Sequence, residues 1–374
     1  METGTRAEPL IGFTIGVTAA RRREELVALL RDLGAKVVDA PTVRIVSPAD
    51  DPILRRATDR ALEQRLDYVV ATTGVGWRGW FAAAESWGRA ARLTAACRAA
   101  VLVCRGPKAG TAVRACGLRE VYSAGSDAGD EVLAWLLARD LRGRRIAVQE
   151  HGAPPEGFVD ALRARGADVL RIPVYRWGPP DDPGAVRRLV EQTVRRELHA
   201  LTFTSAPAIG AFLEAAEEQG RRADVLAALR ADVLPVCIGP VCARPLAEQG
   251  VESVWPERGR LGSLVRTITE ALPARARREL HTDTERLVLQ GNALLVDGRT
   301  IWLPPVPGAV LRALAEKPGW VLSRAELLRR VWADTRTDEH AVEAAVARLR
   351  TALGPYAGLV RTVTKRGYRL AVDP

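Results

Sequence analysis

Several residue types and segments are scarce or missing in this 374-residue sequence. It has only five cysteines and four histidines, with no C-x-x-C pair and no histidines at metal-ligand spacing. We therefore expect reduced, mostly buried thiols and no metal site. The sequence also lacks a run of 18 apolar residues and a signal-peptide pattern, so we expect a cytoplasmic protein with no membrane partner.

The composition is that of a folded protein with two or three domains, because 47% of the residues are hydrophobic and 27% are charged. The net charge is +10. Residues 285–374 contain 14 Lys or Arg and 9 Asp or Glu, so their surplus of 5 is half of that charge. This excess is what a nucleic-acid-binding segment needs. The total charge is weaker evidence, since an arginine-rich composition also follows from GC-rich codons.

The C-terminal segment predicts two helices joined by a short polar connection. Ser323 and Glu326 form an S-x-x-E capping box, followed by apolar residues at helical spacing. A second helix is expected from about Asp338 to Leu353, where Gly354 and Pro355 end it. Its apolar stripe consists of Val342, Ala345, Val346, Leu349 and Leu353.

A β-hairpin with a basic turn, Lys365-Arg366-Gly367, is predicted after the second helix. A helix with outward arginines followed by such a hairpin suits a major groove and the neighbouring minor groove. Outward arginines are often only solvated, and such turns are often only turns, but their order here favours DNA binding. The candidate DNA-binding residues are Arg348, Arg350, Thr362, Lys365, Arg366 and Arg369.

Residues 285–374 resemble the winged helix-turn-helix effector domain of OmpR/PhoB-type transcription regulators. The resemblance is carried by segments 285–303, 322–332, 347–353 and 362–369. It implies double-stranded promoter DNA and RNA polymerase as partners, and a homodimer on direct repeats. Thr364 and Ala347 stand where the family often has basic residues, which affects the expected base preference rather than DNA binding.

Residues 10–272 alternate strand and helix signals and contain an internal repeat. Gly34-Ala35 recurs as Gly166-Ala167, and Pro41 recurs as Pro173 with the same offset along the chain. Asp67 to Thr73 recurs as His199 to Ser205, and the offset is again unchanged. The sequence therefore predicts two α/β lobes of one design with parallel sheets.

Hydroxyl groups and glycines follow several of the predicted strands, immediately before helix N-termini. In parallel sheets this edge is the usual ligand crevice, and free backbone N–H groups there favour anions. The same residues also serve simply as helix caps and turns. The candidate ligand residues are Thr72, Thr73, Gly106, Thr204, Ser205 and Gly239.

Residues 1–272 resemble uroporphyrinogen-III synthase. The resemblance is carried by short motifs that include Thr72-Thr73, Gly166-Ala167, Val174-Tyr175, Phe203-Thr204-Ser205 and Ile238-Gly239-Pro240. It implies two crossings between lobes through a two-stranded ladder. Lobe one is then 10–44 with 178–272, lobe two is 47–173, and 273–284 is a charged linker to the effector domain.

The resemblance implies cyclisation of hydroxymethylbilane without a metal or cofactor. Tyr175 matches a family tyrosine considered for assisting loss of the substrate hydroxyl, although a strand aromatic at this place can equally pack between lobes. Val241-Cys242 and Ala19-Ala20 replace polar residues that the family usually has. This loss predicts altered or absent catalysis.

The two resemblances together imply a one-component transcription regulator whose synthase-like part senses a tetrapyrrole or another small anion. This order of parts is similar to actinobacterial regulators of nitrate and nitrite assimilation. The alternative is an active uroporphyrinogen-III synthase that also binds DNA. A two-component receiver is disfavoured, since no aspartate ends a predicted strand.

Overall fold

The computed structural model describes residues 8–125, 129–151, 157–282, 285–332 and 338–372. The chain forms two compact units, Met1–Arg44 with Pro179–Pro374, and Ile45–Gly178. The first unit contains lobe one and the effector domain, and the second is lobe two. The second unit contains the range 47–173 expected for lobe two, and the first unit combines the expected lobe one with the effector domain.

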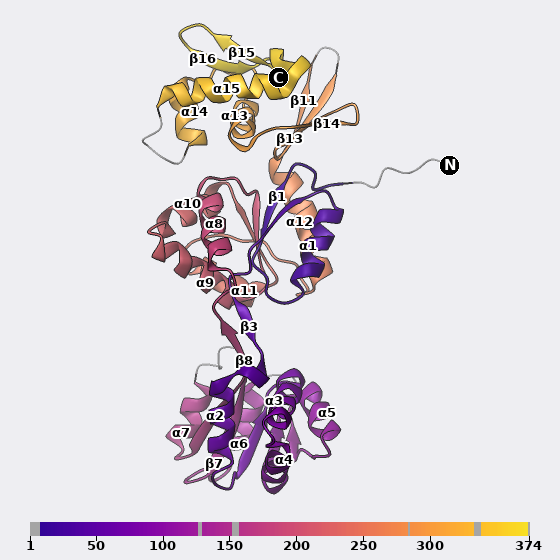
Figure 1. Ribbon diagram of the computed structural model, residues 1–374, viewed down its shortest axis with the longest axis vertical. Helices are drawn as coiled ribbons and strands as arrows, with labels where there is room; N and C mark the ends of the chain where they lie inside the picture. Colours follow the sequence, from indigo (N-terminus) through magenta and orange to yellow (C-terminus); the bar gives the residue numbers. More distant parts are fainter. Residues whose placement is uncertain (1–7, 126–128, 152–156, 283–284, 333–337, 373–374) are drawn as a thin grey trace, which may run out of the picture. The chain divides into compact units, whose positions relative to one another are not determined.

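Lobe one is built on a four-stranded parallel sheet of order β10-β9-β1-β2. Helices α1 and α12 lie on one side of this sheet and α8, α9 and α10 on the other (Figure 1). The elements are β1 (Thr14–Val17), α1 (Arg23–Asp32), β2 (Lys36–Asp39), α8 (Pro183–Val194), β9 (Ala200–Phe203), α9 (Ala206–Glu218), α10 (Arg222–Ala231), β10 (Leu234–Cys237), α11 (Pro240–Ala247) and α12 (Leu261–Ala276).

Lobe two is built on a six-stranded sheet of order β3-β8-β7-β4-β5-β6. Its elements are β3 (Arg44–Val46), η1 (Pro48–Asp50), α2 (Pro52–Ala61), β4 (Tyr68–Ala71), α3 (Gly74–Ser86), α4 (Ala90–Ala99), β5 (Val101–Cys104), α5 (Pro107–Ala115), β6 (Tyr122–Ser123), α6 (Gly129–Leu137), β7 (Arg145–His151), α7 (Phe158–Ala164) and β8 (Asp168–Gly178). The expected ladder between the two crossing segments is the pairing of β3 with β8.

The internal repeat is confirmed, and the two repeats exchange strands. Strands β1, β2, β4 and β5 recur as β7, β8, β9 and β10. Each sheet combines the first two strands of one repeat with the last two of the other, in the order β2-β1-β9-β10 and β8-β7-β4-β5. Equivalent side chains complete the two ladders: Asp67 Oδ2 accepts the Arg145 amide, and His199 Nδ1 accepts the Thr14 amide, each at 2.9 Å.

The effector domain begins earlier than the sequence indicates. Its elements are β11 (Arg277–His281), β12 (Arg286–Gln290), β13 (Ala293–Val296), β14 (Arg299–Trp302), α13 (Pro305–Ala315), α14 (Arg324–Val331), α15 (Glu339–Leu353), η2 (Gly354–Leu359), β15 (Val360–Val363) and β16 (Gly367–Leu370). The prediction of a linker is wrong for residues 273–281, because α12 continues to Ala276 and β11 follows directly. Only Leu280 of β11 is buried, so its sequence lacks the alternation of a strand.

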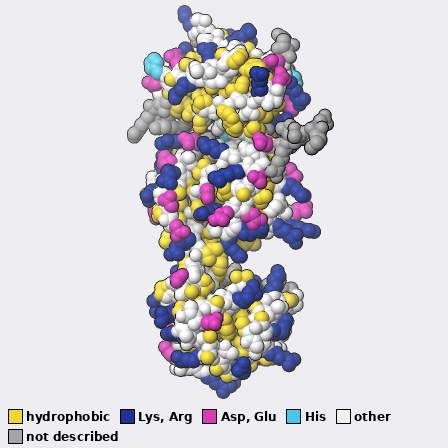
Figure 2. Space-filling view, turned by 45° about the vertical axis from the view of Figure 1, so that its right-hand side comes forward, with side chains coloured by type: hydrophobic (Ala, Val, Ile, Leu, Met, Phe, Trp, Pro, Cys, Tyr) yellow, Lys and Arg dark blue, Asp and Glu magenta, His cyan; other side chains and the backbone are white. Residues whose placement is uncertain are grey.

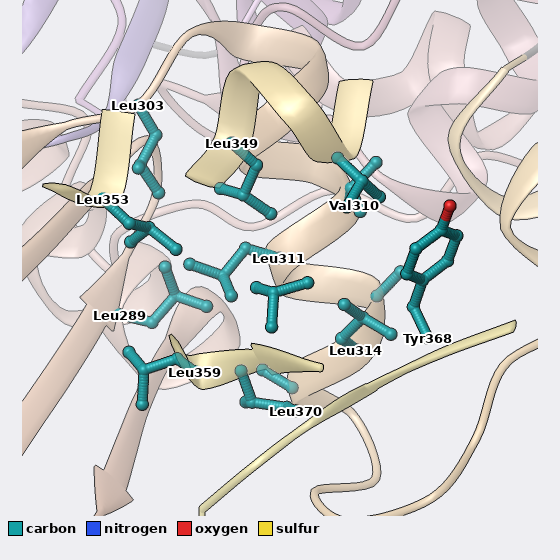
Figure 3. Close-up of a cluster of buried hydrophobic side chains, with 14 of the residues drawn as sticks. Leu289, Leu303, Val310, Leu311, Leu314, Leu349, Leu353, Leu359, Tyr368 and Leu370 are labelled. Atoms are coloured by element: carbon teal, nitrogen blue, oxygen red, sulfur yellow. The ribbon is translucent and has the colours of Figure 1, made fainter. Parts of the chain in front are cut away.

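A single apolar core holds the effector domain together. Figure 3 shows side chains from β12, α13, α15 and β16 converging on Leu311, which is fully buried. The entire predicted stripe of the second helix, from Val342 to Leu353, lies in this core with at most 1% of each side chain exposed. Burial of this kind fixes which face of α15 points outward.

Candidate functional site

Helices α14 and α15 both begin where the sequence predicts. The Ser323 hydroxyl accepts the Glu326 amide at 3.2 Å, and the Glu326 carboxylate accepts the Ser323 amide at 2.9 Å, so the capping box is formed. The Asp338 carboxylate accepts two amides at the start of α15. These caps satisfy donors that the first turn would otherwise leave unpaired.

Arg348 is the exposed arginine of α15 and lies outside the buried stripe. Its Nε donates to the Ala344 carbonyl of its own helix, at 3.3 Å. Arg350 is partly buried and is held differently. Its Nε and Nη2 donate to the Val360 carbonyl at 3.1 and 2.8 Å, and Nη2 also donates to the Thr362 hydroxyl at 2.9 Å. Arg350 therefore joins the helix to β15 and positions the hairpin.

The hairpin of β15 and β16 is the predicted wing. Lys365 has a left-handed φ of 63° and Gly367 a φ of 133°. A Cβ on Gly367 would lie 2.0 Å from the Leu322 carbonyl oxygen, so this close approach requires glycine. Tyr368 and Leu322 exchange two backbone hydrogen bonds of 2.9 and 3.0 Å, which attach the wing to the residue before the capping box.

The predicted basic residues of the wing lie at the surface. Lys365, Arg366 and Thr362 are exposed, and Arg369 is partly exposed. Arg361, which was not among the predicted residues, is exposed and directly opposite Arg369 in the strand register. Like charges facing each other across two strands repel, and a phosphate between them would remove that repulsion. Arg361 could have been predicted as a candidate, because it lies one residue before Thr362 in the predicted hairpin.

Basic side chains alone do not mark the interface. On the face drawn in Figure 2, Lys and Arg occur on every part of the surface and are mixed with Asp and Glu. The distinguishing feature of the effector domain is the place of its basic groups, on the outer face of a buried helix and on the neighbouring wing.

The ligand candidates of lobe one lie where the parallel strands end. Thr204 and Ser205 follow β9 and are partly exposed, and Gly239 follows β10. Ser205 and Gly239 are the N-cap residues of α9 and α11, but the Ser205 hydroxyl makes no capping hydrogen bond. A Cβ on Gly239 would meet no atom within 4 Å. This edge therefore offers a hydroxyl and two helix N-termini.

The ligand candidates of lobe two occupy the equivalent strand ends of that lobe. Thr73 caps α3, where its hydroxyl accepts the Gly76 amide at 3.1 Å. Gly106 is the N-cap residue of α5 and is buried. The Thr72 hydroxyl oxygen is buried and has no hydrogen-bond partner among the residues that the structure describes. Capping thus explains Thr73 and leaves Thr72 as the better ligand candidate.

Tyr175 is a partly buried residue of β8. Its ring meets the Trp177 ring edge-on, with centroids 5.1 Å apart. This contact accounts for the aromatic ring as a packing element of β8.

Residues 24–266 match the family model described as "Uroporphyrinogen-III synthase HemD". The chain belongs to the uroporphyrinogen-III synthase family. A mutant uroporphyrinogen III synthase from Thermus thermophilus is 31% identical, with a TM-score of 0.56; the match covers 70% of this chain and 100% of that one. A putative uroporphyrinogen-III synthase from Methanothermobacter thermautotrophicus is 26% identical over 251 residues, 67% of this chain and 95% of the relative.

The C-terminal part has relatives of another kind. Residues 298–370 match the family model "Transcriptional regulatory protein, C terminal". The transcriptional regulatory protein AfsQ1 of Streptomyces coelicolor is 39% identical over 94 residues, 24% of this chain and 41% of that protein. The chain is therefore a fusion of a uroporphyrinogen-III synthase fold with a winged-helix DNA-binding domain, which is the build of a transcription regulator.

The residues that differ from the usual synthase pattern can now be placed in the structure. Val241 is 80% exposed at the start of α11, so an apolar side chain occupies the strand-end surface of lobe one. Cys242 is buried instead, and its Sγ lies 3.5 Å from the Phe203 carbonyl oxygen. After β1, Ala19 is buried, and Arg22 pairs with Glu25 at 2.6 Å. Val241 and the partly exposed Ala20 are therefore the departures that place an apolar side chain at the surface.

The cysteines are free thiols and most of them are buried. Burial raises the pKa of Cys97 and of Cys104 to about 12. Across the described ranges, no group of three or more His, Cys, Asp or Glu could hold a metal ion. No helix in the same ranges is long and apolar enough to cross a membrane.

Proposed function

We propose that this chain is a one-component regulator in which a synthase-family sensor, rather than an active synthase, controls a DNA-binding effector domain. The observation that carries the DNA-binding half is the exposed Arg348 on a helix whose apolar stripe is completely buried. Because α15 cannot rotate without exposing its core stripe, Arg348 is presented in one fixed direction. The wing places Lys365 and Arg366 at a second surface of the same domain.

The proposed roles of these cations differ. A guanidinium on the recognition helix can pair bidentately with guanine O6 and N7, which contributes about 1–3 kcal/mol of base discrimination. Cations at the wing tip meet phosphates or the minor groove, and these contacts carry little sequence information. Arg350 is assigned a positioning role, since its donors already bind β15.

Binding titrations on operator and scrambled DNA at several salt concentrations test this assignment. Arg348→Ala is expected to weaken operator binding and to relax base preference at one position of each half-site. Lys365→Ala with Arg366→Ala is expected to weaken binding to both DNAs equally. It should also lower the slope of log affinity against log salt concentration by about 1–2. Equal loss of affinity for both DNAs in Arg348→Ala would contradict the placement of α15 in the major groove.

The sensor half of the proposal rests on the strand ends. Ser205 keeps a hydroxyl that caps no helix, and the N-termini of α9 and α11 present backbone donors, so an anionic ligand such as a tetrapyrrole carboxylate can still bind. The exposed Val241 supplies no donor where a polar residue would stabilise charge. We therefore assign ligand binding without efficient turnover to the lobes.

Two measurements separate sensing from catalysis. Calorimetry with uroporphyrin-like polycarboxylates is expected to show saturable binding that Ser205→Ala weakens. Incubation with hydroxymethylbilane is expected to give mainly the spontaneous isomer I product. Predominantly isomer III at ordinary enzyme concentration would instead support the second candidate, an active synthase, which the retained Thr204 and Ser205 hydroxyls favour.

The regulated pathway that we propose is nitrate and nitrite assimilation. Nitrite reduction in that pathway uses sirohaem, which is made from uroporphyrinogen III, so a tetrapyrrole-shaped sensor would report on cofactor supply. We further propose that two protomers bind direct repeats and contact RNA polymerase. Footprinting on promoters of nitrite reductase genes and on unrelated promoters tests this: equal occupancy of both sets would reject the pathway.

A further inference from the structure

A cavity of about 360 Å³ lies within the first unit, between lobe one and the effector domain. Lobe one contributes the C-terminal ends of α8, α10 and α12, and the effector domain contributes α13 and the end of α14. The cavity lining has more arginines than carboxylates, and its carboxylates are Asp232 and Glu316. Its arginines are Arg195, Arg196, Arg275, Arg278, Arg312 and Arg330.

Half of these arginines already have acidic partners. Arg196 pairs with Asp232 and Arg330 with Glu316, and Arg195 lies 3.8 Å from Glu191. The other three, Arg275, Arg278 and Arg312, form no ion pair with a carboxylate in the part of the chain that the structure describes. The cavity therefore has an excess of positive charge.

Arg312 is the most constrained of the three. Its Nη1 donates to the Gly291 carbonyl at 2.8 Å and to Asn292 Oδ1 at 2.6 Å, so the side chain is fixed at the cavity wall. Burial lowers the pKa of Arg312 to about 10, and the guanidinium is still charged at neutral pH. The Asp232 charge opposes this lowering but forms no ion pair with Arg312, so a ligand anion beside the guanidinium would offset the remaining cost of its burial.

His199 adds a neutral donor to the same wall. The side chain is 7% exposed, and its Nδ1 accepts the Thr14 amide at 2.9 Å, so the ring proton lies on Nε2. Burial, together with the nearby Arg312 charge, lowers the pKa of His199 to about 3. Nε2 is buried and has no hydrogen-bond partner within the described ranges. A ligand oxygen would satisfy this donor.

Arginine at a helix C-terminus is common for a simpler reason, the favourable interaction with the helix dipole. That explanation covers Arg195 and Arg275, which lie at the ends of α8 and α12. It does not cover Arg312. This residue lies in the last turn of α13, but its guanidinium turns back to Gly291, at the contact between lobe one and the effector domain, which we call the seam. Leu198, Leu289 and Val306 provide apolar wall between the charges, which suits a ligand with a carbon skeleton.

We propose that this cavity binds a small organic anion that carries phosphate or carboxylate groups, with Arg312 and His199 as inner donors and Arg275 and Arg278 at the entrance. Guanidinium groups bind both kinds of oxyanion through paired N–H donors. The site is separate from the proposed sensor surface, because His199 and Thr14 lie at the amino ends of β9 and β1. Ser205 and Gly239 follow the carboxyl ends of the same sheet.

Calorimetry on the full chain without DNA tests the proposal, with inorganic pyrophosphate and citrate as probes at constant ionic strength. Saturable binding of at least one probe is expected, and the comparison of the two identifies phosphate or carboxylate as the preferred group. Arg275→Gln with Arg278→Gln is expected to weaken binding at least tenfold. Both side chains are exposed, so this variant keeps the fold.

Two matched double variants locate the effect. Arg92→Gln with Arg98→Gln removes two exposed charges from lobe two, and Lys365→Gln with Arg366→Gln removes two from the wing; both are expected to change affinity less than twofold. Loss of binding in the wing variant alone would place the anion on the DNA surface and overturn the proposal. Absence of saturable binding by either probe up to 10 mM (roughly 2.7 kcal/mol of binding free energy) would also overturn it.

Discussion

Replacing Gly12 with alanine is expected to separate lobe one from the effector domain without unfolding either. Gly12 has a left-handed φ of 84°, and an added Cβ would lie 2.2 Å from the Gln290 carbonyl oxygen and 2.8 Å from Ala293 Cβ. Both neighbours belong to the effector sheet, and the nearer one is backbone. The seam must therefore move by about 1 Å to restore ordinary contact distances.

The loss of docking free energy follows from the hydrogen bonds that cross this seam. The Asn292 amide donates to the Gly12 carbonyl at 2.8 Å, and Gln290 Nε2 donates to the Ile11 and Pro9 carbonyls at 2.9 and 3.0 Å. At about 1 kcal/mol each, three such bonds contribute about 3 kcal/mol. Seam opening should therefore become about 100-fold more frequent.

Hydrogen exchange of the Asn292 amide measures this opening, because that N–H is bonded across the seam. We expect its exchange in Gly12→Ala to accelerate about 100-fold at pH 7 under conditions where exchange follows the opening equilibrium. Gly298→Ala is the matched control. Gly298 also has a left-handed φ, 76°, but an added Cβ would meet no atom within 4 Å, so this variant reports the backbone cost alone.

A second variant at the same contact tightens the test. A Cβ on Gly291 would lie 2.4 Å from the Gly12 carbonyl oxygen, so Gly291→Ala should resemble Gly12→Ala. The double variant should then be little worse than either single one, because both break one contact. Unchanged Asn292 exchange in Gly12→Ala, or fully additive effects of the pair, would refute the reasoning.

Three further outcomes are expected. Because the folded pKa of His199 lies near 3, below its ordinary 6.5, its contribution to stability is complete above about pH 6.5. This contribution is lost as the pH falls toward the folded pKa, with a limiting slope of about 1.4 kcal/mol per pH unit. Urea unfolding should show this slope reduced in His199→Asn. Gly367→Ala should destabilise the effector domain by about 2–3 kcal/mol, since the Leu322 carbonyl blocks the Cβ; an unchanged unfolding midpoint would contradict it. Arg350→Met should speed amide exchange in the wing and weaken binding to all DNA sequences alike, whereas altered base preference would assign Arg350 a base contact instead.

Local signals made the effector helices predictable. The Ser323 and Glu326 pair fixes the start of α14 through bonds between close neighbours in the chain, and the stripe of α15 repeats at helical spacing. The internal repeat made the two lobes predictable in the same way. Residues of the first repeat and their counterparts in the second, such as Asp67 and His199, are separated by one constant offset in the chain. In each case, the information lies in a pattern that the sequence itself displays.

The unpredicted features depend on contacts that no sequence pattern displays. β11 looked like a charged linker because a single residue, Leu280, faces the core. Arg350 looked like a free DNA contact because its partner, the Val360 carbonyl, is a backbone atom that no side-chain pattern reveals. The seam cavity joins α8 to α13, which are far apart in the chain, and its arginines are ordinary surface residues in each helix taken alone.

The exchange of strands between the repeats has a consequence for synthesis. Lobe two is one continuous stretch, Ile45–Gly178, so it can fold while the ribosome is still extending the chain. Lobe one cannot, because β1 needs β9 as its neighbour, and Thr14 and His199 are 185 residues apart. Strand β1 leaves the ribosome before the other strands of lobe one, yet it must wait for β9 before it can pair, so it is the apolar segment on which a chaperone would act during synthesis.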